Sequence, residues 1–303
     1  MECHFIINPN AGNGAALNYI SCIKAAGQNN ISVLSSKKEA VEYAGKIAES
    51  GKISRIYAVG GDGTLNGIIN GTYGYGNIEI GIIPAGSGND FVRCFNDKNR
   101  FRDLKAQLDG IAVSVDIIKA KFDNGIETYF INMSNIGFDC NVVINAEIIK
   151  KKYHIGSASY YIGVFQEFFK KWGQDVRVVF DDGDVYEGNQ LLCTIANGQY
   201  CGGGFCSSPK ACLNDGYIDV VIINKVSRGK MLSLFRRYRD GTYLEDTKLE
   251  RVFFYKKTKH LKIEMDKEYG ISVDGEIYYF KTAEFNVLNR GIRLVIPNGV
   301  YFN

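Results

Sequence analysis

Glycine-rich turns that directly follow short apolar segments are the feature of this sequence that most restricts its fold. Residues 60–63 are Gly-Gly-Asp-Gly, and residues 84–88 are Pro-Ala-Gly-Ser-Gly; each set ends an apolar segment. Helix-type patterns, such as the one at 37–49, separate these segments. Strands that alternate with helices through short connections form a parallel sheet whose functional loops share one edge. We therefore predict a three-layer α/β domain with a parallel sheet over residues 1–115.

The pattern changes near residue 115, where β-type segments begin to dominate. The segment at 176–180 is followed by an Asp-Asp-Gly-Asp turn and a second apolar run, which predicts a hairpin. Two helical patterns, at about 157–172 and 228–240, interrupt the strands. This half is predicted to be an antiparallel β-sandwich with helical insertions.

The chain length favours two domains, since 303 residues are many for one compact core. An apolar segment at 292–296 is predicted to return to the first domain. The first domain would then comprise residues 1–115 and 291–303, and the second would comprise residues 116–290.

Composition argues against several classes of protein. No segment approaches the roughly 20 consecutive apolar residues of a membrane-spanning helix, and the N-terminus lacks the pattern of a signal peptide, so we expect a cytoplasmic protein. A formal net charge of +3 is too small to favour nucleic acid as a partner. The eight cysteines include no C-x2-C pair, which argues against zinc.

The loop at 60–63 suits a phosphate ligand. Glycines let the backbone approach a ligand closely, and their amides, with the start of the next helix, attract an anion. Asp62 would repel phosphate, so it indicates a role through Mg²⁺ or as a base; a tight turn in which Asp62 caps the helix is the structural alternative. The loop is neither a Rossmann loop, because Asn66 stands at the third glycine position, nor a P-loop, because G-K-[ST] is missing.

Two further loops repeat this logic. The loop at 84–88 leads into Asn89 and Asp90 at a predicted helix start, and residues 8–14, Asn-Pro-Asn-Ala-Gly-Asn-Gly, follow the first strand. Because the carboxyl ends of neighbouring parallel strands face one crevice, we expect the three loops to form one site.

Taken in order, these motifs resemble the diacylglycerol kinase catalytic-domain family, which includes sphingosine and ceramide kinases and has NAD kinases as distant relatives. Later segments agree with the resemblance: 135–139, 197–204, 213–217 and 274–276. It covers nearly the whole chain and implies an ATP-binding α/β domain, a β-sandwich lipid-substrate domain and an active site in the cleft between them.

The resemblance also implies roles for matching positions. Asp62, Asp90 and Asp139 would form an acidic network that organises catalytic Mg²⁺. The positions expected to hold ATP lie in the three loops, with a looser match for a polar residue near Ser35 or Ser36. They are Asn8, Pro9, Asn10, Ala11, Gly12, Ser35, Gly60, Gly61, Asp62, Gly63, Thr64, Leu65, Asn66 and Ser87.

Two more positions take roles from the resemblance. Glu276 would be the general base, with Asp62 as the competing candidate; spacing alone makes residues 274–276 a hairpin turn. Asp215, with main-chain carbonyls at Cys212 and Tyr217, resembles a structural Mg²⁺ site, for which oxygen ligands are suitable. A simple Asn-Asp-Gly turn is the alternative for Asp215.

The expected function is thus the MgATP-dependent phosphorylation of diacylglycerol to phosphatidic acid. A sphingoid base, ceramide or phosphatidylglycerol stays open as the acceptor, NAD is less favoured, and a non-catalytic lipid- or nucleotide-binding regulator is the rival class. The apolar face of the 157–172 helix either packs on the sandwich or lines an acyl-chain cleft.

A lipid substrate implies peripheral contact with a membrane surface. The basic clusters at 150–152 and 236–239 fit such contact, although ordinary solvated helix ends explain them equally well. A homodimer also stays open, because the sequence does not give the oligomeric state.

Overall fold

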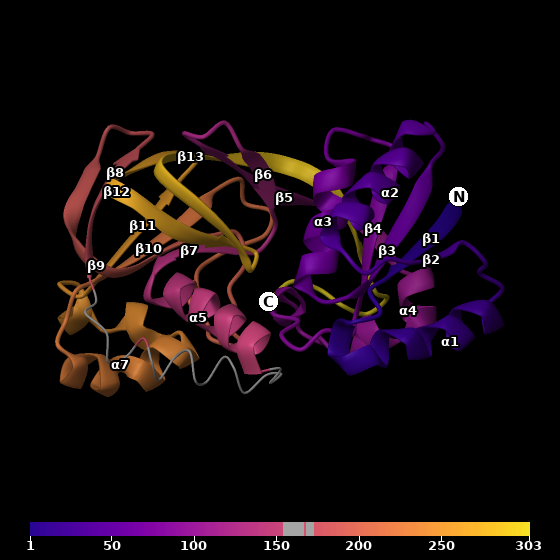
Figure 1. The fold of residues 1–303 in the computed structure, drawn as a ribbon, viewed down its shortest axis with the longest axis horizontal. Helices are drawn as coiled ribbons and strands as arrows, with labels where there is room; N and C mark the ends of the chain where they lie inside the picture. Colours follow the sequence, from indigo (N-terminus) through magenta and orange to yellow (C-terminus); the bar gives the residue numbers. More distant parts are fainter. Residues whose placement is uncertain (154–166, 168–172) are drawn as a thin grey trace.

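The computed structural model describes residues 1–153, 167 and 173–303 (Figure 1). The predicted helix at 157–172, with the proposed lipid-facing Phe165 and Phe168, lies outside the described residues except for Glu167. The predicted helices at 37–49 and 228–240 are confirmed, since α2 spans Lys37–Glu49 and α7 spans Arg228–Asp240.

Four parallel strands form the core of the N-terminal half. In the order β2-β1-β3-β4, each pairs in parallel with its neighbour. Their bounds are β1 Glu2–Ile7, β2 Ile31–Val33, β3 Ser54–Gly60 and β4 Ile78–Pro84. β3 and β4 are buried along their whole length, which explains their nearly continuous apolar sequences.

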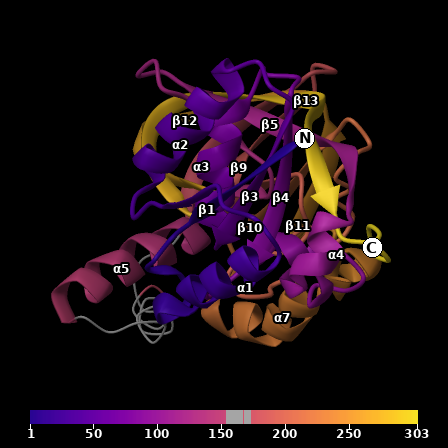
Figure 2. The ribbon, with the colours of Figure 1, turned by 90° about the vertical axis from the view of Figure 1, so that its right-hand side faces the viewer.

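Helices cover both faces of these strands, as Figure 2 shows. Alternate strand residues point to opposite faces, so two separate cores form. On one face Ile56 and Ile80 pack with α2 and α3 (Asp62–Thr72). On the other, Tyr57 packs with α1 (Tyr19–Ala25) and contacts α4 (Leu104–Leu108). This half is a three-layer α/β unit.

The C-terminal half is rich in antiparallel strands. β12 pairs antiparallel with β13, β7 and β8, and β9 pairs antiparallel with β7, β8 and β10. The strands are β5 Ile111–Phe122, β6 Glu127–Phe130, β7 Met133–Gly137, β8 Gln174–Phe180, β9 Val185–Ala196, β10 Ile218–Asn224, β11 Phe253–Thr258, β12 His260–Val273 and β13 Glu276–Ile296.

The two halves share one hydrogen-bonded sheet of 13 strands. We expected a parallel sheet and a separate sandwich; the structure instead has a mixed sheet, parallel at β2-β1-β3-β4 and mainly antiparallel elsewhere. β13 makes the connection, because its last residues pair in parallel with β4. The apolar segment at 292–296, predicted to return to the first domain, is the end of the long strand β13.

A bulge lets β13 pass from one half to the other. Its register against β5 shifts between Leu288 and Ile292, and Arg290 has a positive φ of 55°. The fully buried Asp116 holds this bulge, since its carboxylate accepts hydrogen bonds from the amides of Arg290 at 2.6 Å and Gly216 at 2.7 Å. Asp116 therefore fixes the path between the two halves.

Two helices flank the C-terminal strands: α5 (Phe138–Tyr153) and α7. Five short 3₁₀ segments complete the described elements: η1 Ala11–Asn18, η2 Phe91–Cys94, η3 Arg100–Arg102, η4 Thr242–Glu245 and η5 Thr247–Leu249. Within the described ranges, no helix has the length and apolar character needed to cross a membrane.

Candidate functional site

A cavity of about 310 Å³ lies where the three predicted loops meet; we call it the cradle. Eight predicted nucleotide-binding residues line it: Asn8, Asn10, Ala11, Gly12, Gly61, Gly63, Thr64 and Ser87. The loops follow β1, β3 and β4, whose carboxyl ends face the same edge of the sheet. The cradle is thus formed by backbone and small side chains at the ends of parallel strands.

Glycine is required at the narrowest points of the cradle. Gly12 has a φ of +58°, and a Cβ there would overlap the carbonyl oxygen of Ala85. A Cβ on Gly86 would lie 2.5 Å from the Cα of Gly61, so these two loops pack backbone to backbone. In the same wall, the Thr64 hydroxyl is buried and has no hydrogen-bond partner in the described structure. The narrow parts of the cradle therefore leave no room for further side chains.

Other predicted nucleotide residues lie outside the cradle wall. The Ser35 hydroxyl is bound to Glu39, Leu65 packs in the core, and the Asn66 amide contacts Tyr129 and Asp274. Pro9 and Gly60 are also absent from the wall, and Asp62 faces the neighbouring cavity described below.

Three residues of the wall were missed from the sequence: Leu34, Lys37 and Ala40. Ser36, the alternative to Ser35 in the looser match, also lines the wall. Ser36 caps α2 in a reciprocal pairing with Glu39, and this fixes the start of the helix against the cradle. The Ser-x-x-Glu spacing was a readable signal for that helix start. Lys37 brings a cation to a cavity suited to phosphate.

A second cavity, of about 130 Å³, contains the predicted acidic residues; we call it the carboxylate pocket. Asp62, Asp90 and Asp139 line it, together with Asp274, which we did not predict as a site residue. Met133, Val143 and Cys201 add apolar surface to its wall. The pocket lies between the two halves, because its residues come from both.

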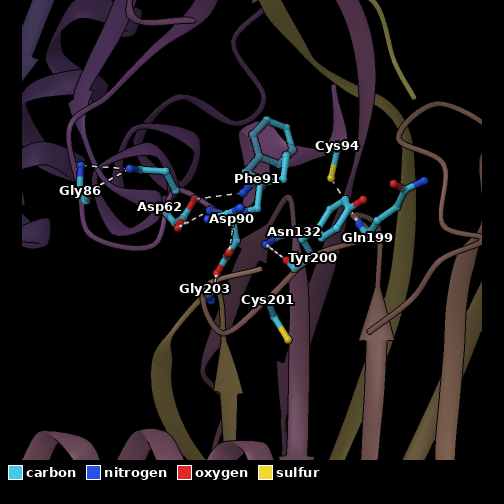
Figure 3. Close-up of polar contacts among 12 residues, drawn as sticks. Asp62, Gly86, Asp90, Phe91, Cys94, Asn132, Gln199, Tyr200, Cys201 and Gly203 are labelled. Atoms are coloured by element: carbon cyan, nitrogen blue, oxygen red, sulfur yellow. Dashed lines mark hydrogen bonds and ion pairs between the residues drawn. The ribbon is translucent and has the colours of Figure 1, made fainter. Parts of the chain in front are cut away.

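Asp62 links the first and second glycine-rich loops (Figure 3). Its carboxylate accepts hydrogen bonds from the amides of Asp90 at 3.2 Å and Phe91 at 3.3 Å. It makes no capping bond to its own helix α3, whose N-cap is Gly61, so the structural alternative of a simple helix cap is wrong. Burial, with the nearby charge of Asp90, raises the pKa of Asp62 to about 6.

Asp90 and Asp139 are each held by the C-terminal half. The Asp90 carboxylate accepts a hydrogen bond from the Gly203 amide at 2.9 Å (Figure 3). It also forms an ion pair with Arg93 at 3.2 Å. The Asp139 carboxylate accepts from the Tyr238 hydroxyl at 3.1 Å. Burial raises the pKa of both carboxyls, that of Asp139 to about 6.

Asp274 holds the hairpin between β12 and β13 against the rest of the carboxylate pocket through hydrogen bonds. Its carboxylate accepts four hydrogen bonds, from the Asn66 side chain at 2.9 Å and from the backbone amides of Ile131, Asn132 and Met133 at 3.1–3.2 Å. It therefore joins α3 to the β6–β7 segment. A positive φ of 46° at Asp274 turns the chain toward Gly275 and Glu276.

Glu276 lies at the opposite side of this turn and lines the cradle rather than the carboxylate pocket. Gly275 lines the carboxylate pocket, so the turn forms part of both walls. No described residue donates a hydrogen bond to the exposed Glu276 carboxylate. Its carboxylate is consequently available to a ligand in the cradle.

Comparisons with known proteins agree with this geometry. A family model described as "Diacylglycerol kinase catalytic domain" matches residues 2–120, and one described as "YegS C-terminal NAD kinase beta sandwich-like domain" matches residues 133–296. A diacylglycerol kinase from Staphylococcus aureus is 31% identical over 247 residues, covering 81% of this chain and 75% of that protein. The chain belongs to the diacylglycerol kinase family.

Other members of the family match over almost their full length. A diacylglycerol kinase from Mycobacterium tuberculosis is 27% identical over 96% of this chain and 94% of its own. A crystal structure of a candidate diacylglycerol kinase from Bacillus anthracis superposes with a TM-score of 0.76 at 26% identity, covering 99% of this chain and 98% of that one. The resemblance inferred from the motifs is confirmed.

Diacylglycerol kinase family membership implies a divalent metal with the nucleotide. Within the described ranges, no group of three or more His, Cys, Asp or Glu side chains lies close enough together to bind a metal ion. Mg²⁺ commonly keeps several waters and binds through substrate phosphates with one or two carboxylates, which this site can supply. One oxygen of Asp90 is buried without a hydrogen bond, although Arg93 lies beside it. The carboxylate pocket therefore fits Mg²⁺ that arrives with a nucleotide.

The predicted structural Mg²⁺ site at Asp215 does not fit a metal. The ammonium group of Lys257 lies 2.5 Å from one Asp215 carboxylate oxygen, and the other oxygen accepts from the Tyr217 amide at 3.1 Å. A second cation would meet the Lys257 charge at short range. In this member of the diacylglycerol kinase family, a lysine stands where we expected a metal.

Proposed function

We propose that this protein transfers the γ-phosphoryl group of ATP, with Mg²⁺, to the free hydroxyl of diacylglycerol and so produces phosphatidic acid. One observation carries the proposal: the cradle and the carboxylate pocket adjoin at the turn formed by Asp274, Gly275 and Glu276. A phosphate-binding cavity and an acidic cavity at one junction provide a donor site beside an acceptor site.

The walls support these two assignments. Glycine amides and Lys37 suit a polyphosphate in the cradle. Met133, Val143 and Cys201 give the carboxylate pocket an apolar part next to its acids. An acceptor with a hydroxyl head and an apolar body, such as diacylglycerol, matches that combination better than a fully polar acceptor such as NAD.

The proposed step is an in-line phosphoryl transfer. The acceptor oxygen forms a bond to the γ-phosphorus, the bond from the γ-phosphorus to the β,γ-bridging oxygen breaks, and ADP leaves. The hydroxyl proton passes to the carboxylate of Glu276, which is unpaired by described residues and faces the cradle. Bound Mg²⁺ would neutralise phosphate charge during the transfer. Asp274 positions Glu276 by fixing the turn.

Asp62 is the competing base in this proposal. Its pKa of about 6 suits proton transfer near neutral pH, but its carboxylate already accepts two backbone hydrogen bonds. We assign Asp62 to holding the second glycine-rich loop in place beside the phosphates. The two roles make different predictions for the two variants.

The test is the transfer of labelled phosphate from ATP in mixed micelles that contain diacylglycerol, ceramide, sphingosine or phosphatidylglycerol, with NAD as a soluble acceptor. We expect labelled phosphatidic acid, and a loss of kcat of about 10²–10⁴-fold in Glu276→Gln. The matched control is Glu268→Gln, an exposed position on β12 outside both cavities, which should retain wild-type activity. Equal melting temperatures would show that both variants fold.

Three results would change the assignment. Another labelled lipid would replace diacylglycerol as the acceptor, and labelling of NAD without any lipid would reject lipid kinase activity. Absence of transfer to every acceptor, with ATP binding intact, would favour a non-catalytic regulator. Retention of activity in Glu276→Gln with its loss in Asp62→Asn would move the base to Asp62.

A further inference from the structure

Helix α7 presents apolar side chains to solvent as well as to the core. Met231, Leu234 and Tyr238 are buried in a cluster with strands β9 and β10. In contrast, Leu232 is 62% exposed and Phe235 is 40% exposed. A helical stripe contains residues spaced three or four apart, so these two exposed side chains follow one another along the surface.

Arginines surround this apolar pair. Arg228 and Arg239 lie at the two ends of the same stripe, and the Arg236 side chain, one turn from Leu232, is 88% exposed. The helix carries five Arg or Lys residues and one acidic residue, Asp240, so its formal net charge is +4. Asp240 lies within ion-pair distance of Arg236 and Arg239 but offsets a single charge, and Arg237 pairs with Asp246 outside the helix. We call the residues Leu232, Phe235, Arg236 and Arg239 the outer α7 surface.

The outer α7 surface is connected to the carboxylate pocket. The Phe235 ring packs edge-on against Phe205, with centroids 5.5 Å apart. Phe205 ends the short loop in which the Gly203 amide donates to Asp90. From the inner face of the same helix, Tyr238 donates to Asp139. Figure 1 shows α7 and α5 on the same side of the C-terminal strands.

We propose that the outer α7 surface docks on an anionic phospholipid bilayer. The inference rests on the proposed lipid kinase function, because a substrate dissolved in a bilayer requires the pocket to lie near one. Leucine and phenylalanine side chains enter the boundary between head groups and acyl chains, and the arginines bind lipid phosphates around them. Charge also disfavours a second copy of this chain as the occupant, since a two-fold contact would bring two positively charged helices together.

The test measures binding of the full chain to sedimented vesicles. One set contains phosphatidylcholine, and the other contains phosphatidylcholine with about one third phosphatidylglycerol. The variants are Leu232→Glu, which places a carboxylate at the centre of the surface, and Arg236→Glu, which reverses a charge. Two matched controls lie in the N-terminal half: Ile53→Glu, at a 64% exposed isoleucine, and Lys38→Glu, at an 87% exposed lysine.

We expect wild-type protein to bind the anionic vesicles and to lose binding as salt rises. Each α7 variant should bind about five- to tenfold more weakly, whereas each control should bind as wild type does. Equal binding by wild type and both α7 variants would overturn the proposal, as would binding that is independent of lipid charge. A changed oligomeric state of the α7 variants, with vesicle binding preserved, would instead assign the surface to contacts between copies and would also overturn it.

Phosphorylation of a short-chain diacylglycerol, kept below its critical micelle concentration, separates this proposal from the proposed function. Leu232 and Arg236 line neither cavity, so their variants should phosphorylate the dispersed substrate at the wild-type rate. Retained activity there with lost vesicle binding supports the docking surface. A wild-type protein without activity on that substrate would contradict the proposed function, and the vesicle experiment would still decide whether α7 binds a bilayer.

Discussion

The cradle and the carboxylate pocket are neighbouring cavities built in opposite ways. Backbone and small side chains form most of the cradle, where the Thr64 hydroxyl is buried without a partner and Glu276 receives no hydrogen bond from the described residues. In the carboxylate pocket, Asp62, Asp90, Asp139 and Asp274 all accept hydrogen bonds from the protein. The chain itself therefore holds the acidic side chains of the pocket in place, whereas it leaves the Glu276 carboxylate of the cradle unpaired.

This difference implies that substitutions in the carboxylate pocket should mainly lower the stability of the protein. Substitutions in the cradle should mainly weaken ligand binding.

The largest expected effect is that of Asp274→Ala on the free energy of unfolding. It leaves three buried backbone amides, those of residues 131–133, without their acceptor, and we expect the free energy of unfolding to fall by about 3–5 kcal/mol. Urea denaturation measures it. Asp274→Asn keeps one acceptor oxygen, so its free energy of unfolding should lie between those of the wild type and the alanine variant. A loss of less than about 1 kcal/mol in Asp274→Ala would contradict the role of Asp274 in holding the turn between β12 and β13.

A smaller effect of opposite sign is expected for Asp139→Asn. Burial raises the folded-state pKa of Asp139 to about 6, above the usual unfolded value, so its ionised form destabilises the fold as pH rises from about 4 to about 6. The asparagine oxygen can still accept from Tyr238 without that charge. At pH 7.5 we expect the free energy of unfolding of Asp139→Asn to be about 1–3 kcal/mol higher than that of the wild type. The variant should nevertheless lose activity.

The pH dependence of the free energy of unfolding tests whether the buried charge of Asp139 causes the higher stability of the variant. Below about pH 4 the wild-type carboxyl is protonated in both states, and the two proteins should have nearly equal stability. Asp109→Asn, at an exposed position, is the matched control and should show little difference at either pH. A gain in Asp139→Asn that persists unchanged at pH 4 would rule out the buried charge as its source.

The smallest effect should come from Gly12→Ala, which tests the cradle. The new methyl group would overlap the Ala85 carbonyl oxygen, so the loop must shift. We expect the Kd for ATP, measured by calorimetry, to rise about tenfold, which corresponds to about 1.4 kcal/mol. Gly14→Ala is a close control, because Gly14 also has a positive φ, of 93°, but its Cβ would meet no atom within 4 Å. Equal weakening by both variants would attribute the effect to backbone strain rather than to cradle shape.

Much of the cradle could be predicted from the sequence because its parts are local. Each glycine-rich loop directly follows its strand, and parallel strand ends must meet at one edge. The same reasoning placed Asp62 and Asp90 together. Lys37 was missed, and Ser36 was named only as an alternative to Ser35, because both follow a short strand whose loop has no glycine signal.

The supports of the carboxylate pocket could not be predicted in this way. Asp274 contacts amides more than 140 positions earlier in the chain, and Asp116 contacts Arg290 at a separation of 174. Such pairings depend on how β12 and β13 cross between the halves, which local patterns do not encode. The continuity of β13 was hidden for the same reason, since the polar bulge near Arg290 divides its apolar pattern.

The ion pair of Lys257 with Asp215 has a consequence for how the protein responds to its surroundings. A positive charge attached covalently to the chain is present in every molecule once it is synthesised, and no chelator can remove it. This corner of the protein therefore keeps its charge balance at any concentration of free metal ions, and a chelator should leave its stability unchanged.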